Sequence, residues 1–94
     1  DTFCPLGPVI QTNFEQYPEL GIKCFVNDEL KQDGNTKDMI FSVGEILEFV
    51  SSIMTLLPGD VVLTGTPEGV SKVQPGDEIK IEIETIGTLI NPVK

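Results

Sequence analysis

The sequence contains no histidine, so a mechanism carried wholly by these residues works without the side chain most often used as a general base at neutral pH. Basic residues are also scarce. Six Lys and Arg residues stand against 15 Asp and Glu residues, which gives a formal net charge of −9. A surface of this sign repels nucleic-acid phosphates and anionic membranes. We therefore expect no nucleic-acid partner and no membrane partner.

Long apolar runs are missing too. None approaches the roughly 20 residues that cross a bilayer, and the N-terminus lacks the basic and apolar regions of a signal peptide. The two cysteines, Cys4 and Cys24, are too few for a disulfide framework or a zinc site. We expect both thiols to be reduced and largely buried in a cytoplasmic protein, with a disulfide between them as the alternative.

The length of 94 residues, with 39% hydrophobic and 22% charged residues, is typical of one small globular unit. No internal repeat or low-complexity tract divides it. One helix and a few strands bury only a modest apolar area, so we expect this unit to rely on further sequence or on another subunit. The chain starts at Asp1 without a methionine. We expect that it was processed or is part of a longer polypeptide.

One helix is strongly indicated. Ser42 precedes Glu45 by three residues, the spacing of a capping box in which each side chain satisfies a backbone N–H of the first turn. Apolar residues then recur at helical spacing as far as Leu57, and Pro58-Gly59 ends the pattern. The sequence predicts a helix over about residues 42–57.

The rest of the chain is typical of β structure. An Asn27-Asp28 pair between two β-prone runs predicts a hairpin, and the segment Asp33–Asp38 has the composition of a loop. Strands are predicted near Val9–Ile10 and at Leu20–Val26, Glu29–Gln32, Val61–Leu63, Glu78–Glu84 and Thr88–Ile90. Strands with one substantial helix, not regularly alternating, indicate an α+β fold.

The first candidate site is Thr64–Gly69, directly after the predicted strand Val61–Leu63, which we expect to be buried on both faces. A threonine flanked by glycines at the C-terminal end of a strand offers backbone N–H groups and a hydroxyl to a carboxylate or phosphate. The alternative is a tight turn that needs Gly65 and Gly69 only for positive φ, and spacing alone favours this alternative. No Gly-Lys-Ser/Thr follows, so this is no nucleotide phosphate loop.

Two acidic segments are weaker candidates. Oxygen ligands along Asp33–Asp38 can hold Mg²⁺ or Ca²⁺, but the segment does not match the calcium-loop template, and a solvated turn is the better interpretation. The acids at 78, 82 and 84 are best explained as a solvated strand face, with Lys80 as their counter-charge. The residues alone show no nucleophile–base pair and no full metal cage.

Four strings nevertheless resemble the C-terminal portion of the catalytic domain of the fumarylacetoacetate hydrolase (FAH) family, in the expected order and over essentially the whole chain. They are DTFCPLGPVI at 1–10, QDGNTKDMIFS at 32–42, LLPGDVVLTGTPEGV at 56–70 and VQPGDEIKIEIETIGTLINPV at 73–93. The combination of LTGTPEGV, a following PGD and a terminal IGTLINPV is specific. The resemblance implies that residues 1–94 are the C-terminal part of a single FAH-like domain.

The resemblance implies a mixed β-roll and a homodimer. It also implies an enzyme that depends on Mg²⁺ or Mn²⁺ and acts on small 2-oxo acids. The substrates would be acylpyruvates, β-diketo acids, or intermediates of aromatic catabolism similar to 2-hydroxyhepta-2,4-diene-1,7-dioate. The reaction would be C–C hydrolysis, decarboxylation or isomerisation. In each, a divalent cation chelates the oxo-acid oxygens and stabilises the enolate that forms.

Transferred residue by residue, the resemblance implies that Thr66 binds the substrate carboxylate, with Gly65 in the same turn. It also implies that Thr2 lies near the metal, as a ligand or in contact with a ligand, with ordinary backbone support as the alternative, and that Asp1 is an orienting carboxylate near the site. The family's metal-binding carboxylates and its water-activating His–Glu pair match no residue here and are expected upstream of Asp1.

This chain would therefore supply the half that anchors substrate, with no catalytic residue of its own. We expect the 94 residues alone to show no hydrolase activity and no tight Mg²⁺ binding. The alternative is a small-ligand-binding or structural β module that kept the fold without the chemistry.

Overall fold

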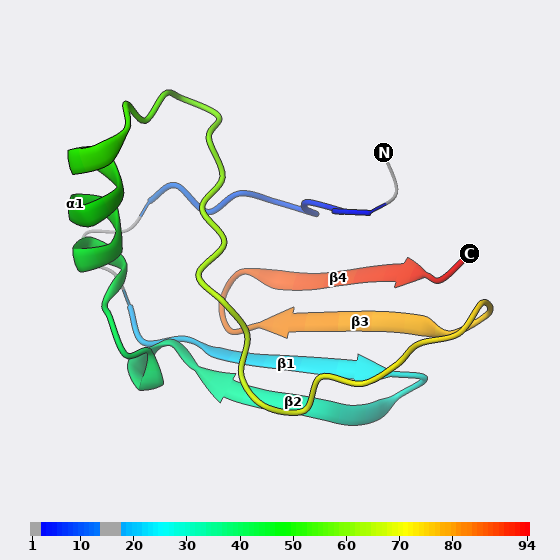
Figure 1. Cartoon of the computed structure of the whole chain (residues 1–94). Helices are drawn as coiled ribbons and strands as arrows, with labels where there is room; N and C mark the ends of the chain where they lie inside the picture. The colour runs from blue at the N-terminus through cyan, green and yellow to red at the C-terminus, as the bar shows by residue number, and fades with distance from the viewer. Residues whose placement is uncertain (1–2, 14–17) are drawn as a thin grey trace.

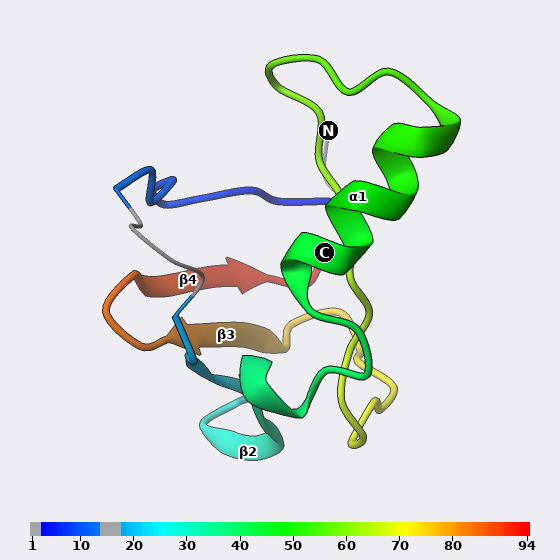
Figure 2. The same ribbon diagram turned by 90° about the vertical axis from the view of Figure 1, so that its left-hand side faces the viewer.

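The computed structural model describes residues 3–13 and 18–94. Four strands form one antiparallel sheet in the order β2-β1-β3-β4, and a helix, α1, stands beyond one end of the strands (Figures 1 and 2). The elements are β1 (Gly21–Val26), β2 (Glu29–Asn35), the 3₁₀ turn η1 (Thr36–Asp38), α1 (Val43–Ile53), β3 (Glu78–Ile83) and β4 (Gly87–Pro92). The predicted α+β class is confirmed.

The β1–β2 hairpin turns where the sequence predicts it. Asn27 and Asp28 both have positive φ (50° and 65°), the backbone of a two-residue turn whose twist matches that of its strands. β1 pairs on its other side with β3, so that the isoleucines of β3 lie opposite apolar residues of β1. These cross-strand pairs are Ile79–Val26, Ile81–Cys24 and Ile83–Ile22.

Two Pro-Gly-Asp turns share one geometry. Gly59 and Gly76 both have φ of 95°, the backbone of a type II turn with proline before it. In the first turn the carboxylate of Asp60 accepts a hydrogen bond from the backbone N–H of Leu57 at 2.7 Å. In the second, the carboxylate of Asp77 accepts from the N–H of Gln74 at 2.8 Å. The aspartate therefore closes each turn.

Asp77 also ties its turn to the tip of the β1–β2 hairpin. The side-chain amide of Asn27 donates to Asp77 Oδ1 at 2.8 Å, and its oxygen accepts from the N–H of Glu78 at 2.9 Å. These bonds to the ionised form lower the pKa of Asp77, with the Gln74 N–H as the main cause and the Asn27 amide second. The start of β3 is thus held against the hairpin tip.

We expect low pH to remove the stabilisation that the ionised Asp77 carboxylate gives the fold. Because the pKa of Asp77 is lower in the folded protein than in the unfolded chain, its stabilisation is present above the unfolded pKa and lost as pH falls through the folded pKa. In the intact protein that carries this chain, Asp77→Asn should lower Tm at neutral pH, and the difference from wild type should shrink as pH falls through the lowered pKa of Asp77. Glu68→Gln, which removes a carboxylate outside this turn, is the control. A Tm difference for Asp77→Asn that stays constant with pH would contradict this.

The helix starts as predicted and ends earlier. Ser42 and Glu45 form the capping box, with the N–H of Ser42 donating to Glu45 Oε2 at 2.7 Å and the N–H of Glu45 donating to Ser42 Oγ at 3.2 Å. The predicted end near residue 57 is wrong, because Met54 has extended backbone and caps the helix. Leu57 gives its N–H to Asp60 rather than to a helical carbonyl, and proline disfavours helical backbone in the residue before it.

Two strand predictions and one loop prediction need correction. Val9–Ile10 and Val61–Leu63 form no strand, and Val61 and Leu63 are 58% and 79% exposed, not buried. A strand needs a neighbour to pair its backbone groups, and neither segment pairs with a strand of the described sheet. The predicted loop Asp33–Asp38 is half strand, because β2 continues to Asn35 along β1.

None of the described residues is buried. The chain exposes 7805 Å², whereas a folded monomer of its mass of 10.3 kDa exposes about 5,400 Å². Its radius of gyration is 14.6 Å, against about 12 Å for a compact domain of this length. Large apolar side chains such as Phe49 and Ile53 of α1 are about two-thirds exposed. The described elements therefore do not enclose a core of their own.

Two smaller findings concern membrane-spanning helices and the thiols. In the part of the chain that the structure describes, no helix is both long and apolar enough to cross a bilayer. Cys4 and Cys24 are both free, which confirms the reduced state, but Cys4 is exposed, so the expected burial is wrong for this thiol. It lies in the N-terminal segment beside Phe3 and Leu6, which are also exposed.

We expect a polypeptide of these 94 residues alone to lack cooperative folding, because the sheet and the helix bury too little apolar area to offset chain entropy. Differential scanning calorimetry should show no sharp transition, and a dye that reports exposed apolar surface should bind. The intact protein is the comparison. A sharp two-state transition of the 94-residue monomer would contradict this expectation.

Candidate anion-binding turn

The segment Thr64–Gly69, which we call the threonine turn, lies against the edge strand β2. Figure 1 shows the segment between α1 and β3 crossing the sheet and curling past β2. The side-chain nitrogen of Gln32 donates two hydrogen bonds across this contact, to Thr66 Oγ1 at 2.7 Å and to the carbonyl oxygen of Pro67 at 2.7 Å. These bonds join Gln32 to residues that lie 34 and 35 positions later in the sequence.

A β-bulge shapes the strand at this point. Cys24 pairs with Gln32 and Phe25 with Leu30, which leaves Lys31 as an extra residue in β2. The backbone of Gly69 lies against the carbonyl of Lys31, so closely that an added Cβ would collide with it. Glycine is required at this position by space as well as by its φ of 102°.

The other contact is at Gly34. A Cβ there would lie 3.1 Å from Cγ of Pro67, so the absent side chain lets the proline ring approach the strand. Thr66 is exposed, as is its neighbour Gly65, whose φ of 102° gives the turn its shape. The Thr66 hydroxyl is thus held at one side by Gln32 and is open to solvent at another. Positive φ at both glycines of Thr64–Gly69 is confirmed.

Gly65 and Gly69 offer a matched pair of substitutions. Both have φ of 102°, but a Cβ on Gly65 meets nothing within 4 Å, whereas one on Gly69 collides with the Lys31 carbonyl. In the intact protein we expect Gly65→Ala to cost about 1 kcal/mol from backbone strain alone. Gly69→Ala should cost about 1–3 kcal/mol more, since the turn must move off β2. Denaturant unfolding measures both. Equal losses would mean that the contact with Lys31 does not hold the turn.

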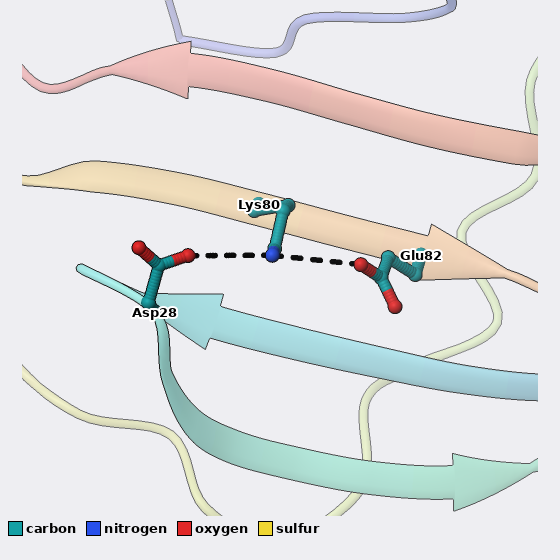
Figure 3. Close-up of polar contacts among 3 residues, drawn as sticks. All are labelled: Asp28, Lys80 and Glu82. Atoms are coloured by element: carbon teal, nitrogen blue, oxygen red, sulfur yellow. Dashed lines mark hydrogen bonds and ion pairs between the residues drawn. The ribbon is translucent and has the colours of Figure 1, made fainter.

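A second polar cluster lies on the sheet and is structural (Figure 3). Lys80 Nζ on β3 lies 3.3 Å from Asp28 Oδ1 at the hairpin tip and 3.5 Å from Glu82 Oε1. It also lies 4.5 Å from the centre of the Phe25 ring, a cation–π contact. The hydrogen bond to Asp28 is the main cause that raises the pKa of Lys80. The prediction that Lys80 is a counter-charge of the strand acids is confirmed for Glu82, and Asp28 is a partner that the sequence pattern did not indicate.

Metal ligands do not gather in the described residues. Across 3–13 and 18–94, no three His, Cys, Asp or Glu side chains lie close enough together to hold an ion. These residues therefore do not fit, by themselves, the divalent cation implied by the resemblance. Asp1 and Thr2, expected near that cation, lie outside the described residues. Their predicted role stays a prediction.

Gln32 is the residue of this site that the sequence did not reveal. It stands at the start of the QDGNTKDMIFS string, but its partners lie more than thirty positions away. Gln32 was predicted at the end of a strand, but nothing in the sequence indicated which distant segment lies against that strand. A local signal was present in Gly34, because a glycine inside a strand marks a close approach of another chain segment.

Comparison with known proteins agrees with this arrangement. The family model described as fumarylacetoacetate (FAA) hydrolase C-terminal matches residues 1–94. A 2-hydroxyhepta-2,4-diene-1,7-dioate isomerase from Mycobacterium marinum is 52% identical and superposes with a TM-score of 0.91, over 99% of this chain and 36% of its own. Maleylpyruvate hydrolase from Sphingobium sp. SYK-6, in a crystal structure with manganese(II) and pyruvate, is 43% identical with a TM-score of 0.92, over 99% and 36%.

Bovine oxaloacetate tautomerase FAHD2B, a mitochondrial protein, is 45% identical over 99% of this chain and 32% of its own length. The chain belongs to the fumarylacetoacetate hydrolase family, and it is part of a domain of that type, with four antiparallel strands and one helix. It spans about a third of the length of these relatives. The similar proteins are a hydrolase, an isomerase and a tautomerase of small acids.

Proposed function

We propose that the intact protein carrying this chain is a metal-dependent hydrolase or isomerase of small 2-oxo acids, and that the threonine turn binds the carboxylate of the substrate. Acylpyruvates, β-diketo acids and dienedioates similar to 2-hydroxyhepta-2,4-diene-1,7-dioate are the substrate class. The observation that carries the proposal is the exposed Thr66 hydroxyl, fixed beside positive-φ Gly65. The manganese and pyruvate in the 43% identical maleylpyruvate hydrolase support it.

The role of this chain is to bind and orient. An exposed hydroxyl donates a hydrogen bond to a carboxylate, and such charge-assisted bonds are about twice as strong as neutral ones. Gly65, with no side chain near it, leaves backbone on that side of the turn accessible to a ligand. Thr66 and Gly65 together would therefore fix the carboxylate end of the substrate.

The proposal assigns Mg²⁺ or Mn²⁺ as cofactor, with ligands outside the described residues. When bound, such an ion stabilises the enolate that forms as the bond breaks. It also answers an electrostatic problem, because a chain with a formal charge of −9 does not attract an anionic substrate by itself. A cytoplasmic homodimer completes the proposal, and the free cysteines agree with a reducing compartment.

The test is Thr66→Val in the intact protein. Loss of a hydrogen bond to a charged group should raise KM for the 2-oxo acid about 10- to 100-fold. Thr66→Ser, which keeps a hydroxyl, should restore most of the affinity. Turnover should be assayed with an acylpyruvate and with oxaloacetate in the presence of Mg²⁺, and again after chelation and return of the metal.

Thr55→Val is the control, because Thr55 is also exposed but lies beyond the end of α1, away from the turn. It should leave KM unchanged. If Thr66→Val leaves KM for every oxo acid unchanged while the enzyme turns over, the threonine turn does not bind the substrate. If the intact protein shows no turnover with or without metal, the β-module alternative is favoured.

A further inference from the structure

The orientation of the Gln32 amide is fixed by its partners. A carbonyl oxygen can only accept a hydrogen bond, so the 2.7 Å contact with Pro67 O requires the amide nitrogen, not the amide oxygen, to face the turn. The same nitrogen lies 2.7 Å from Thr66 Oγ1. An amide nitrogen carries two protons, and both are used here. Thr66 is therefore the acceptor in its contact with Gln32.

The bond from Gln32 determines what the Thr66 hydroxyl can do with its own proton. A threonine hydroxyl has one proton to donate and two acceptor sites. With Gln32 donating to one acceptor site, the Thr66 proton is free to turn toward a ligand. We propose that Gln32 is a positioning residue, which keeps the Thr66 hydroxyl a hydrogen-bond donor toward an anionic ligand. The inference rests on the proposed function of the threonine turn and deepens it, because it makes the site specific for a group that accepts, such as an ionised carboxylate.

The position of the turn does not depend on this amide alone. Gly69 lies against the Lys31 carbonyl at the bulge, and Gly34 lies against the ring of Pro67. These two steric contacts define where the turn lies on β2. Gln32, between them, defines which partner the hydroxyl has. Removing the amide should therefore change the hydrogen bonding of the Thr66 hydroxyl more than the position of the turn on β2.

The experiment compares two substitutions in the intact protein. Gln32→Met has a similar length and no polar group, so KM for the 2-oxo acid should rise about 2- to 10-fold, with kcat changed less than about twofold. Gln32→Glu should do more, about tenfold or above, because a carboxylate takes the Thr66 proton as an acceptor and repels the anionic substrate. Tm of each variant is measured in parallel.

A pH profile separates positioning from a structural role. Once protonated, the introduced carboxyl has an O–H that donates to Thr66, as the amide does. KM of the Gln32→Glu variant should therefore fall toward the wild-type value as pH is lowered through the pKa of that carboxyl. A KM penalty that stays constant with pH would overturn the inference, because position 32 would then affect KM whether or not its side chain can donate to Thr66. If Gln32→Met fails to fold, the Gln32→Glu variant still tests the inference.

A double-mutant comparison separates this inference from the proposed function. If Gln32 acts through Thr66, adding Gln32→Met to Thr66→Val should raise KM no further. If the two effects multiply, Gln32 acts independently of Thr66 and the inference is wrong. If Thr66→Val raises KM and Gln32→Met does not, the inference fails while the proposed function stands. If Thr66→Val has no effect, the proposed function itself has failed.

Discussion

The contact between the threonine turn and the edge strand β2 is the interaction on which the candidate site depends. It joins two glycines that permit close approach, at Gly34 and Gly69, with one amide that donates twice from Gln32. The bulge at Lys31 places that carbonyl beside Gly69. An edge strand is where such a contact can form, since its outer backbone groups have no neighbouring strand. The hydroxyl of Thr66 is thereby held against β2, although the turn itself contains no regular secondary structure.

The uncovered surface explains why this chain is a part of the functional unit in its relatives and not the whole of it. Its exposed area exceeds that of a monomer of the same mass by about 2,400 Å², which is in the range of large, stable interfaces. The chain also spans only about a third of each relative. Apolar side chains of α1 and of the segment at 61–63 are what additional polypeptide would cover. Local elements form here, but their packing partners lie beyond the described residues.

Local signals in the sequence were enough for much of the fold. The Asn27-Asp28 hairpin and the Ser42–Glu45 capping box depend on neighbouring residues, and both are confirmed. The errors occur where a distant partner decides. Val61–Leu63 has the composition of a buried strand but lacks a described neighbour, and Asp33–Asn35 has the composition of a loop but pairs with β1. Gln32 was missed for the same reason, since the partners of its amide come from the threonine turn.

The strings that identify the family do not all contribute to the candidate site. Four strings indicated the family, yet the Pro-Gly-Asp segments within two of them are explained by aspartate carboxylates that accept a backbone N–H and close a turn. The threonine turn, by contrast, combines a fixed, exposed hydroxyl with accessible backbone. A chain with a formal charge of −9 and no described metal cluster cannot attract and polarise an oxo acid by itself. Under the proposed function the labour divides accordingly: this chain would orient one carboxylate of the substrate, and a cation held by residues outside the described ones would supply the positive charge that completes binding.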